Sequence, residues 1–337
     1  MSLDCPRRSR GAAFLVRLVA LASLAIAGCE GRCSGSLSGG LSAPGGPSGP
    51  SASTSSASPV GAAEDCAKRD VVTFFVASDT HFGFNAEVER RDLEAIRQMN
   101  TMEGAPWPEP LGGTIGKPCG VLVAGDLTED GKPEEWGKFT SAFGLRGGDG
   151  ALAFPVFEAL GNHDKHHGTF VQERIAERHG AARYSFDWGP VHVVSLGEGP
   201  SDADLVWLDE DLKRKGEGAQ IVLYFHYPLE GRWATGHWFG DGPHRDRLRE
   251  RLEGKNVLGI FHGHDHAAGN YEWRGIDIYR TGSPKHAWHT FAVVEIGGGR
   301  MKVASWDYSG KTWVAWHSKP TAGEGPEVRW VDPRLPR

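Results

Sequence analysis

The chain has 337 residues, of which 39% are hydrophobic, and its 37 Lys and Arg against 43 Asp and Glu give a net charge of −6. These values exclude a wholly disordered chain, a multi-span membrane protein and a disulfide-stapled miniprotein. The mild acidity argues against a dedicated binder of duplex nucleic acid, which needs a basic face for the phosphates. All 15 histidines lie at or after His81, an uneven distribution for a chain of this length.

Residues 1–28 are predicted to be a signal peptide that is removed before folding. Its start is rich in arginine, and residues 18–27 form an apolar stretch too short to span a bilayer stably. The stretch ends in Ile-Ala-Gly followed by Cys29, which resembles the lipobox of bacterial lipoproteins, where the cysteine is acylated. The resemblance implies a lipid-anchored protein of the bacterial cell envelope, facing the periplasm or at the outer membrane. An ordinary secretory peptide with an incidental cysteine is the alternative.

Residues 29–63 are predicted to be a flexible tether. From residue 34 on, nearly all of them are Ser, Gly, Pro, Ala or Thr, a composition that cannot build a packed core. The folded domain is therefore expected over residues 64–337. Removal of the signal peptide takes away four arginines and one aspartate, which leaves 33 basic and 42 acidic residues and a net charge of −9. A mature chain with this net charge is not expected to bind anionic lipid by charge alone.

Two cysteines of the predicted domain each lie just before an apolar run. They are Cys66 and Cys119. If the two runs are neighbouring parallel strands, their starts are adjacent, and a disulfide is geometrically possible in an oxidising compartment. Two unpaired thiols fit the sequence equally well.

From residue 71 onward, short apolar runs alternate with helix-like stretches. Buried strands are predicted at residues 71–77, 121–124, 155–160, 220–225 and 257–261. Helices are predicted at residues 87–100, 133–143, 170–179 and 203–215, and a hairpin at residues 184–196. Alternating strands are expected from residue 269 to residue 316. This order indicates one mixed α/β domain with a β-rich end and without internal repeats.

Polar side chains stand at the carboxyl end of each of the five strands, where open α/β sheets place their active-site loops. They are Asp79, His81, Asp126, Asn162, His163, Asp164, His226, His264 and His266. Carboxylate, amide and imidazole groups without a thiolate suit divalent ions such as Mn, Fe or Zn. A single Gly-Asp is usually a turn and a single histidine a core residue, but turns and cores do not collect histidines at successive strand ends.

The ordered pattern D-x-H, G-D, G-N-H-D, H and G-H-x-H resembles that of the calcineurin-like metallophosphoesterases over roughly residues 70–300. The resemblance implies an α/β fold in which a two-sheet β-sandwich is flanked by helices, and a site with two divalent metal ions. Matched by position, the ligands of the first ion would be Asp79, His81 and His266, those of the second would be Asn162, His226 and His264, and Asp126 would bridge both. The resemblance also implies hydrolysis of a phosphoester bond in a small-molecule substrate.

Two further residues of the third block are assigned to catalysis by the resemblance. His163 matches the family histidine that contacts the phosphate and stabilises or protonates the leaving oxygen, and Asp164 is placed to orient it. The second block reads G-D-L-T-E-D-G here, whereas the family's phosphoprotein phosphatases read G-D-x-x-D-R-G. The missing arginine argues against protein dephosphorylation. No tyrosine stands near Asp126 as in purple acid phosphatases, so the similarity lies with bacterial phosphodiesterases and phosphomonoesterases.

Two aromatic-rich stretches accompany these blocks, at residues 231–239 and 285–289. One interpretation is a wall that stacks on an aromatic or sugar-like leaving group, with Arg232 or Lys285 reaching the phosphate. The other is packing over the sheet. His166 and His167 are expected in a solvated loop. Trp306, Trp313 and Trp316 are expected within strands.

The sequence therefore predicts an envelope enzyme that hydrolyses phosphoester bonds with a dinuclear metal centre, as a phosphodiesterase or a phosphomonoesterase. Two alternatives remain open. One is a catalytically inactive interaction protein of the same fold. The other is a nuclease, although the acidic balance speaks against one and no stable nucleic-acid partner is expected.

Overall fold

Two mixed β-sheets pack face to face in the computed structural model, which describes residues 65–235, 239–240 and 242–335. The predicted signal peptide, the tether, Cys29 and residues 236–238 lie outside the described residues. The seven-stranded sheet has the order β13 (Val328–Val331), β12 (Thr312–Pro320), β11 (Arg300–Asp307), β10 (Thr290–Gly297), β1 (Val72–Ala77), β2 (Pro118–Val123), β3 (Val156–Glu158). The six-stranded sheet has the order β4 (Tyr184–Trp188), β5 (Val191–Ser195), β6 (Gln220–Tyr224), β7 (Val257–His262), β9 (Ile276–Thr281), β8 (Ala268–Trp273).

Parallel pairing determines where the polar strand ends lie. In the first sheet β1 runs parallel to β2 and β2 to β3, and in the second sheet β5, β6 and β7 run parallel in succession. Parallel neighbours have their carboxyl ends at the same edge of a sheet. The loops after β1, β2 and β3 therefore meet at one edge, and those after β6 and β7 meet at the corresponding edge of the other sheet.

The strands of the sheet centre bury both of their faces, as their continuous apolar sequences require. In β1, Phe74 points toward the other sheet, where its ring lies 5.4 Å from that of Trp188 and 6.4 Å from that of Phe261. Phe75 points the opposite way, into the cluster formed with the helices. The alternation follows from the two-residue period of a strand.

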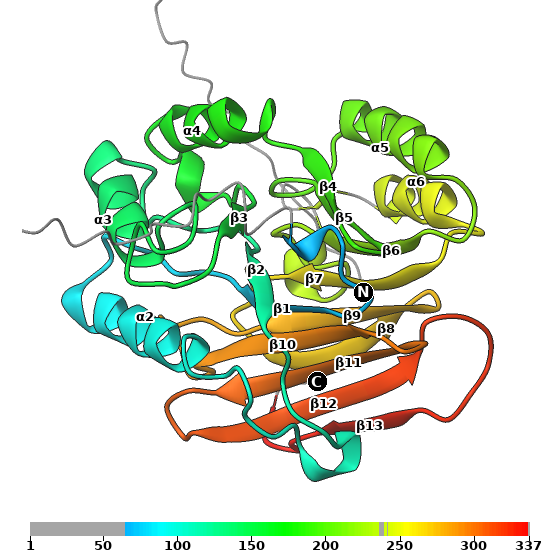
Figure 1. The fold of residues 1–337 in the computed structure, drawn as a ribbon. Coiled ribbons are helices and arrows are strands. Elements are labelled where there is room, and N and C mark those ends of the chain that lie inside the picture. Colours follow the sequence, from blue (N-terminus) through cyan, green and yellow to red (C-terminus); the bar gives the residue numbers. More distant parts are fainter. Residues whose placement is uncertain (1–64, 236–238, 241, 336–337) are drawn as a thin grey trace, which may run out of the picture. The chain divides into compact units, whose positions relative to one another are not determined.

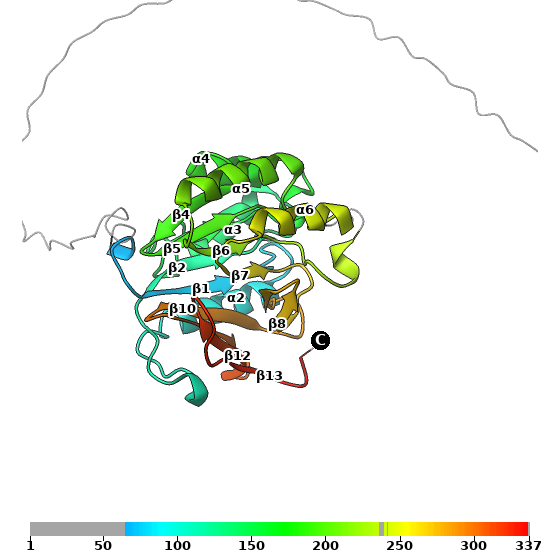
Figure 2. The same cartoon turned by 90° about the vertical axis from the view of Figure 1, so that its right-hand side faces the viewer.

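Helices cover the outer face of each sheet (Figures 1 and 2). The apolar cluster outside the seven-stranded sheet includes residues of α2 (Ala86–Met99), α3 (Pro133–Phe143) and α4 (Phe170–His179). The cluster outside the six-stranded sheet includes residues of α5 (Asp202–Lys215) and α6 (Gly242–Leu252). The predicted two-sheet sandwich with flanking helices is therefore confirmed. No helix within residues 65–335, as far as they are described, is long and apolar enough to cross a membrane.

The predicted elements differ from the structure at two places. α6 and β13 were not predicted, and α6 carries so many charged residues that it buries mainly Leu248 and Leu252. Such a helix lacks the wide apolar stripe by which surface helices are recognised. Trp306, Trp313 and Trp316 lie within strands and pack partly buried against the core, as expected.

Cys66 and Cys119 form a disulfide, and their Cα atoms lie 5.7 Å apart. Of the two possibilities that the sequence left open, the bonded one is therefore found. Cys119 lies in β2, and Cys66 precedes β1, the parallel neighbour of β2. The disulfide therefore joins the beginnings of two neighbouring parallel strands, which is the arrangement assumed when the disulfide was considered from the sequence.

Candidate metal centre

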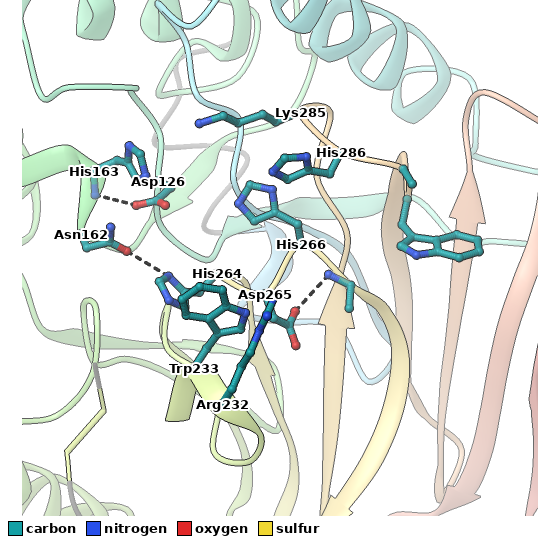
Figure 3. A pocket seen from close by; sticks show the side chains of 13 residues that line it. Asp126, Asn162, His163, Arg232, Trp233, His264, Asp265, His266, Lys285 and His286 are labelled. Atoms are coloured by element: carbon teal, nitrogen blue, oxygen red, sulfur yellow. Dashed lines mark hydrogen bonds between the residues drawn. The ribbon is translucent and has the colours of Figure 1, made fainter. Parts of the chain in front are cut away.

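Seven side chains from five strand ends lie close together, and four of them (Asp126, Asn162, His264 and His266) line a cleft of about 460 Å³. All seven follow β1, β2, β3, β6 and β7 and are the residues predicted as ligands: Asp79, His81, Asp126, Asn162, His226, His264 and His266. Figure 3 shows five residues of this region, Asp126, Asn162, His163, His264 and His266, directed toward the same space. Parallel pairing within each sheet and the packing of the two sheets thus gather groups that lie up to 187 positions apart in the chain, from Asp79 to His266. Metal ligation by these residues stays a prediction.

The side chains fall into two groups, and a carboxylate of the second group lies near a histidine of the first. Asp79, His81 and His266 form the first group, with 3.3 Å between the Nε2 atoms of the two histidines. Asp126, His226 and His264 form the second group, in which His226 Nε2 lies 3.1 Å from Asp126 Oδ2. The same Asp126 oxygen lies 3.8 Å from His81 Nε2. Asp126 is therefore placed between the groups, where the resemblance puts the bridging ligand.

Asn162 completes the second group. Its Oδ1 lies 3.1 Å from His226 Nε2 and 3.0 Å from His264 Nδ1. An amide oxygen adds a donor without adding negative charge. The donor set of imidazole nitrogens and oxygens fits divalent transition ions and contains no thiolate.

Left-handed backbone geometry marks the site. Seven non-glycine residues in the described part of the chain have positive φ, and five of them are Asp79, His81, Asp126, His264 and His266. Asp and His tolerate this region better than most residues, but they occupy it at a cost in strain. Hydrogen bonds between loops hold the geometry, with Asp79 N donating to Gly125 O over 3.0 Å and His81 N donating to Asp126 O over 3.0 Å.

Two glycines permit the close approach of the loops. A Cβ on Gly263 would collide with the carboxylate of Asp79, and a Cβ on Gly161 would collide with Asp126. Backbone conformation does not require glycine at either position, because neither residue has a positive φ. The space is needed for the neighbouring ligand candidate.

The electrostatics of the first group favour a bound cation. Burial raises the pKa of the Asp79 carboxyl to about 8, so a positive charge is needed beside it to keep it ionised at neutral pH. Burial lowers the pKa of His81, and burial together with His81 lowers the pKa of His266 to about 2. Both histidines are therefore neutral, which is the form of imidazole that binds metals.

The second group contains a buried ion pair. Burial opposes charge on His226, but the adjacent Asp126 carboxylate raises the pKa of that histidine to about 10. Conversely, despite its burial, the pKa of Asp126 lies well below its usual range because His226 and His81 are close. Burial and His226 lower the pKa of His264 to about 3. His226 would have to lose its second ring proton to hold a metal ion here.

The imidazole of His163 lies at the cleft, and a hydrogen bond from its Nδ1 atom fixes its orientation. Its Nδ1 donates to the carbonyl oxygen of Glu129 over 2.7 Å, and its backbone N–H donates to Asp126 Oδ1 over 2.9 Å. The proton on Nδ1 is fixed by the carbonyl, so Nε2 is the nitrogen available to a substrate. In the doubly protonated ring, the second proton would lie on Nε2, facing a leaving group in the cleft, as general-acid catalysis requires.

The role predicted for Asp164 needs correction. Its buried carboxylate accepts hydrogen bonds from the backbone of Gly161 (2.8 Å), Thr128 (2.9 Å) and Leu127 (3.2 Å). It therefore joins the loops after β2 and β3, and the Glu129 carbonyl orients His163 in its place. Burial, with Asp126 nearby, raises the pKa of Asp164 to about 6.

Glu129 is the residue that the sequence-based site lacks. One carboxylate oxygen lies 2.8 Å from Nδ1 of His81, on the opposite side of the ring from Nε2, which faces His266. Second-sphere carboxylates of this kind fix the tautomer and orientation of a metal-binding histidine. A signal was available, because Glu129 occupies the position of the second acid in the pattern G-D-x-x-D-R-G.

The two aromatic-rich stretches do reach the cleft. Arg232, Trp233, Lys285, His286 and Trp288 line it together with the ligand candidates (Figure 3). This placement favours the wall interpretation over packing on the sheet. His166 and His167 lie exposed in the loop after His163, as expected.

Comparisons with known proteins agree with this geometry. A family model described as calcineurin-like phosphoesterase matches residues 72–268, more than half of the chain. A search of curated proteins finds no match. The fold is similar to a dimetal phosphatase from Danio rerio (14% identity, TM-score 0.53, covering 78% of this chain and 99% of that one). It is also similar to GAP50, described as the anchor in the inner membrane complex of Plasmodium (12% identity, TM-score 0.55, covering 76% and 90%).

Proposed function

Because this chain belongs to the calcineurin-like phosphoesterase family, we propose that it hydrolyses phosphoester bonds with two divalent metal ions bound at the strand ends. The observation that carries the proposal is the pair of ligand groups that meet at Asp126. Mn, Fe and Zn all fit the nitrogen and oxygen donors. Two such ions lower the pKa of a shared water and neutralise phosphate charge.

The remaining residues of the cleft have separate tasks. His163 presents Nε2 to the cleft and delivers a proton to the leaving oxygen, while the Glu129 carbonyl keeps the ring in place. Asp126 accepts the backbone N–H of His163, so the proposed metal bridge and the proposed proton donor keep a fixed spacing. Arg232 brings a guanidinium to the same cleft, suited to phosphate oxygens.

Metal removal tests the proposal. Dialysis against a chelator should abolish hydrolysis of 4-nitrophenyl phosphoesters, and Mn²⁺ should restore it. The reason is that the bound metal ions are the groups proposed to activate water. The measurement is the release of nitrophenolate before dialysis, after dialysis and after addition of single metal salts. Metal-free protein that stays inactive with every added ion would contradict the proposal.

A noncatalytic interaction protein is the second candidate, since the structurally similar Plasmodium protein is described as an anchor. The favoured reading is the enzyme, because all seven ligand positions keep a metal-binding residue type and a module without turnover does not need them. The acidic composition disfavours a nuclease.

The bacterial envelope setting is part of the same proposal. It rests on the lipobox-like end of residues 1–28, on Cys29 as the acylated residue and on the composition of residues 29–63. A membrane surface would then hold the enzyme through lipid alone. Mass spectrometry of the mature N-terminus should find Cys29 as the first residue with acyl chains attached, and an unmodified Cys29 would refute the anchor.

A further inference from the structure

Lys285 enters the cleft with its charge already neutralised. Its Nζ lies 3.0 Å and 2.8 Å from the two carboxylate oxygens of Glu129 and 4.3 Å from the ring centre of Phe84. The Lys285 side chain is 13% exposed and that of Glu129 20% exposed. Partial burial strengthens such a pair relative to a surface pair.

The pair is also anchored in the site. Glu129 contacts Nδ1 of His81 through its carboxylate and Nδ1 of His163 through its carbonyl oxygen. If Lys285 moved to a phosphate, the Glu129 carboxylate would stay behind, next to a metal-ligand candidate, without its cation. The amine is therefore held back from the substrate by a contact that the site itself needs.

Arg232 is the second cation of the cleft, and its contacts differ from those of Lys285. Its guanidinium lies 4.5 Å from the ring centre of Trp233, and no carboxylate among the described residues pairs with it. Arg232 and Trp233 line the metal cleft and also a second cleft of about 450 Å³, which Glu230, Tyr271 and Arg280 complete. The two clefts thus adjoin and share Arg232, Trp233, Asp265 and Ala267 in their linings.

We infer that the substrate is a phosphodiester, with its phosphate at the metal centre beside Arg232 and its two ester groups directed into the two adjoining clefts. The inference rests on the proposed function. A diester carries one negative charge on phosphate, whereas a monoester carries nearly two at neutral pH. With Lys285 neutralised by Glu129, the second charge of a monoester lacks its cation, and a diester does not need one.

The reaction balances with water alone. The oxygen of water forms a new bond to phosphorus and loses one proton, and one ester P–O bond breaks. The leaving oxygen takes the Nε2 proton of doubly protonated His163, and the proton lost by water restores it. The products are an alcohol and a phosphate monoester. The monoester is the poor substrate on this account, so the reaction stops there.

A comparison of matched substrates tests the inference. The Mn²⁺-loaded full chain should hydrolyse bis(4-nitrophenyl) phosphate with a kcat/KM at least about tenfold above that for 4-nitrophenyl phosphate, the effect of one unbalanced charge near the reacting phosphate. Preference for the monoester would overturn the inference and leave the proposed function standing. Hydrolysis of neither ester would overturn the proposed function itself.

A cycle of variants assigns the preference to the Lys285 charge. Glu129→Gln frees that charge and keeps a side-chain oxygen beside His81, and should shift the diester-to-monoester ratio about tenfold toward the monoester. Lys285→Met should shift the ratio the other way, and the double variant should restore it. Asp130→Asn is the matched control, because it removes an adjacent carboxylate paired with Lys132 (2.6 Å) and not with Lys285.

A binding measurement adds a readout that does not depend on turnover. Inorganic phosphate, followed by tryptophan fluorescence at the cleft, should bind about tenfold more tightly to Glu129→Gln than to the unaltered protein, and less tightly to Lys285→Met. Opposite shifts in the two single variants support the inference. Equal ratios and equal phosphate affinities in all variants would refute it.

Discussion

Replacing Asp126 by asparagine should lower phosphoester hydrolysis by at least about 1,000-fold, or about 4 kcal/mol of transition-state stabilisation, and reduce the bound metal at the same time. The carboxylate lies 3.1 Å from His226 Nε2, in its own ligand group, and 3.8 Å from His81 Nε2, in the other. Asparagine keeps the side-chain oxygen that accepts from His163 N but loses the charge that holds two cations together. Metal content by atomic emission and kcat with a nitrophenyl ester are the two measurements.

The matched control for Asp126 is Asp209→Asn on α5. Asp209 pairs with Lys213 over 2.7 Å on the surface of that helix and touches none of the site residues. This variant should keep both metal content and rate. An Asp126→Asn protein that retains two metal ions and full activity would contradict the bridging role.

Replacing His163 by alanine should preserve metal binding and lower turnover by about 100- to 10,000-fold, the range for a lost general acid. Its ring is held by a backbone carbonyl, and its contact with Asp126 is made by the backbone N–H, which alanine keeps. The loss should be larger for an alkyl leaving group than for 4-nitrophenolate, because a poor leaving group depends more on proton delivery. The kcat for both ester types, measured beside metal content, checks the assignment.

His166→Ala serves as the control for His163. Its ring lies 4.4 Å from that of His163, but its side chain is 44% exposed in the loop. It should change turnover little. A His163→Ala protein that has lost its metal would show that His163 acts as a ligand, and an equal loss for both leaving groups would remove the proton-donor role.

The members of the site could be predicted from sequence because each stands directly after a short apolar run. A strand of that kind is local in sequence, and parallel pairing then brings the carboxyl ends together. Packing of the two sheets is needed as well, because Asp79 and His264 follow β1 and β7 in different sheets and still meet, with His264 N donating to the Asp79 carboxylate over 3.0 Å.

The roles of the loop residues were less predictable. Asp164 follows His163 directly, yet its carboxylate turns to the backbone of neighbouring loops, and it is Glu129, from the loop after β2, whose carbonyl reaches His163. The direction of a side chain in a loop depends on backbone torsions that spacing does not encode. The pairing of Lys285 with Glu129, 156 positions apart, depends on the same long-range packing.

The most direct test of the account is a metal titration of the metal-free full chain, with hydrolysis of bis(4-nitrophenyl) phosphate followed at each addition of Mn²⁺. Activity should rise with bound metal and reach its plateau at two ions per chain in the unaltered protein, with no comparable plateau in Asp126→Asn. Full activity at one ion per chain, or two bound ions without hydrolysis of any phosphoester, would contradict it.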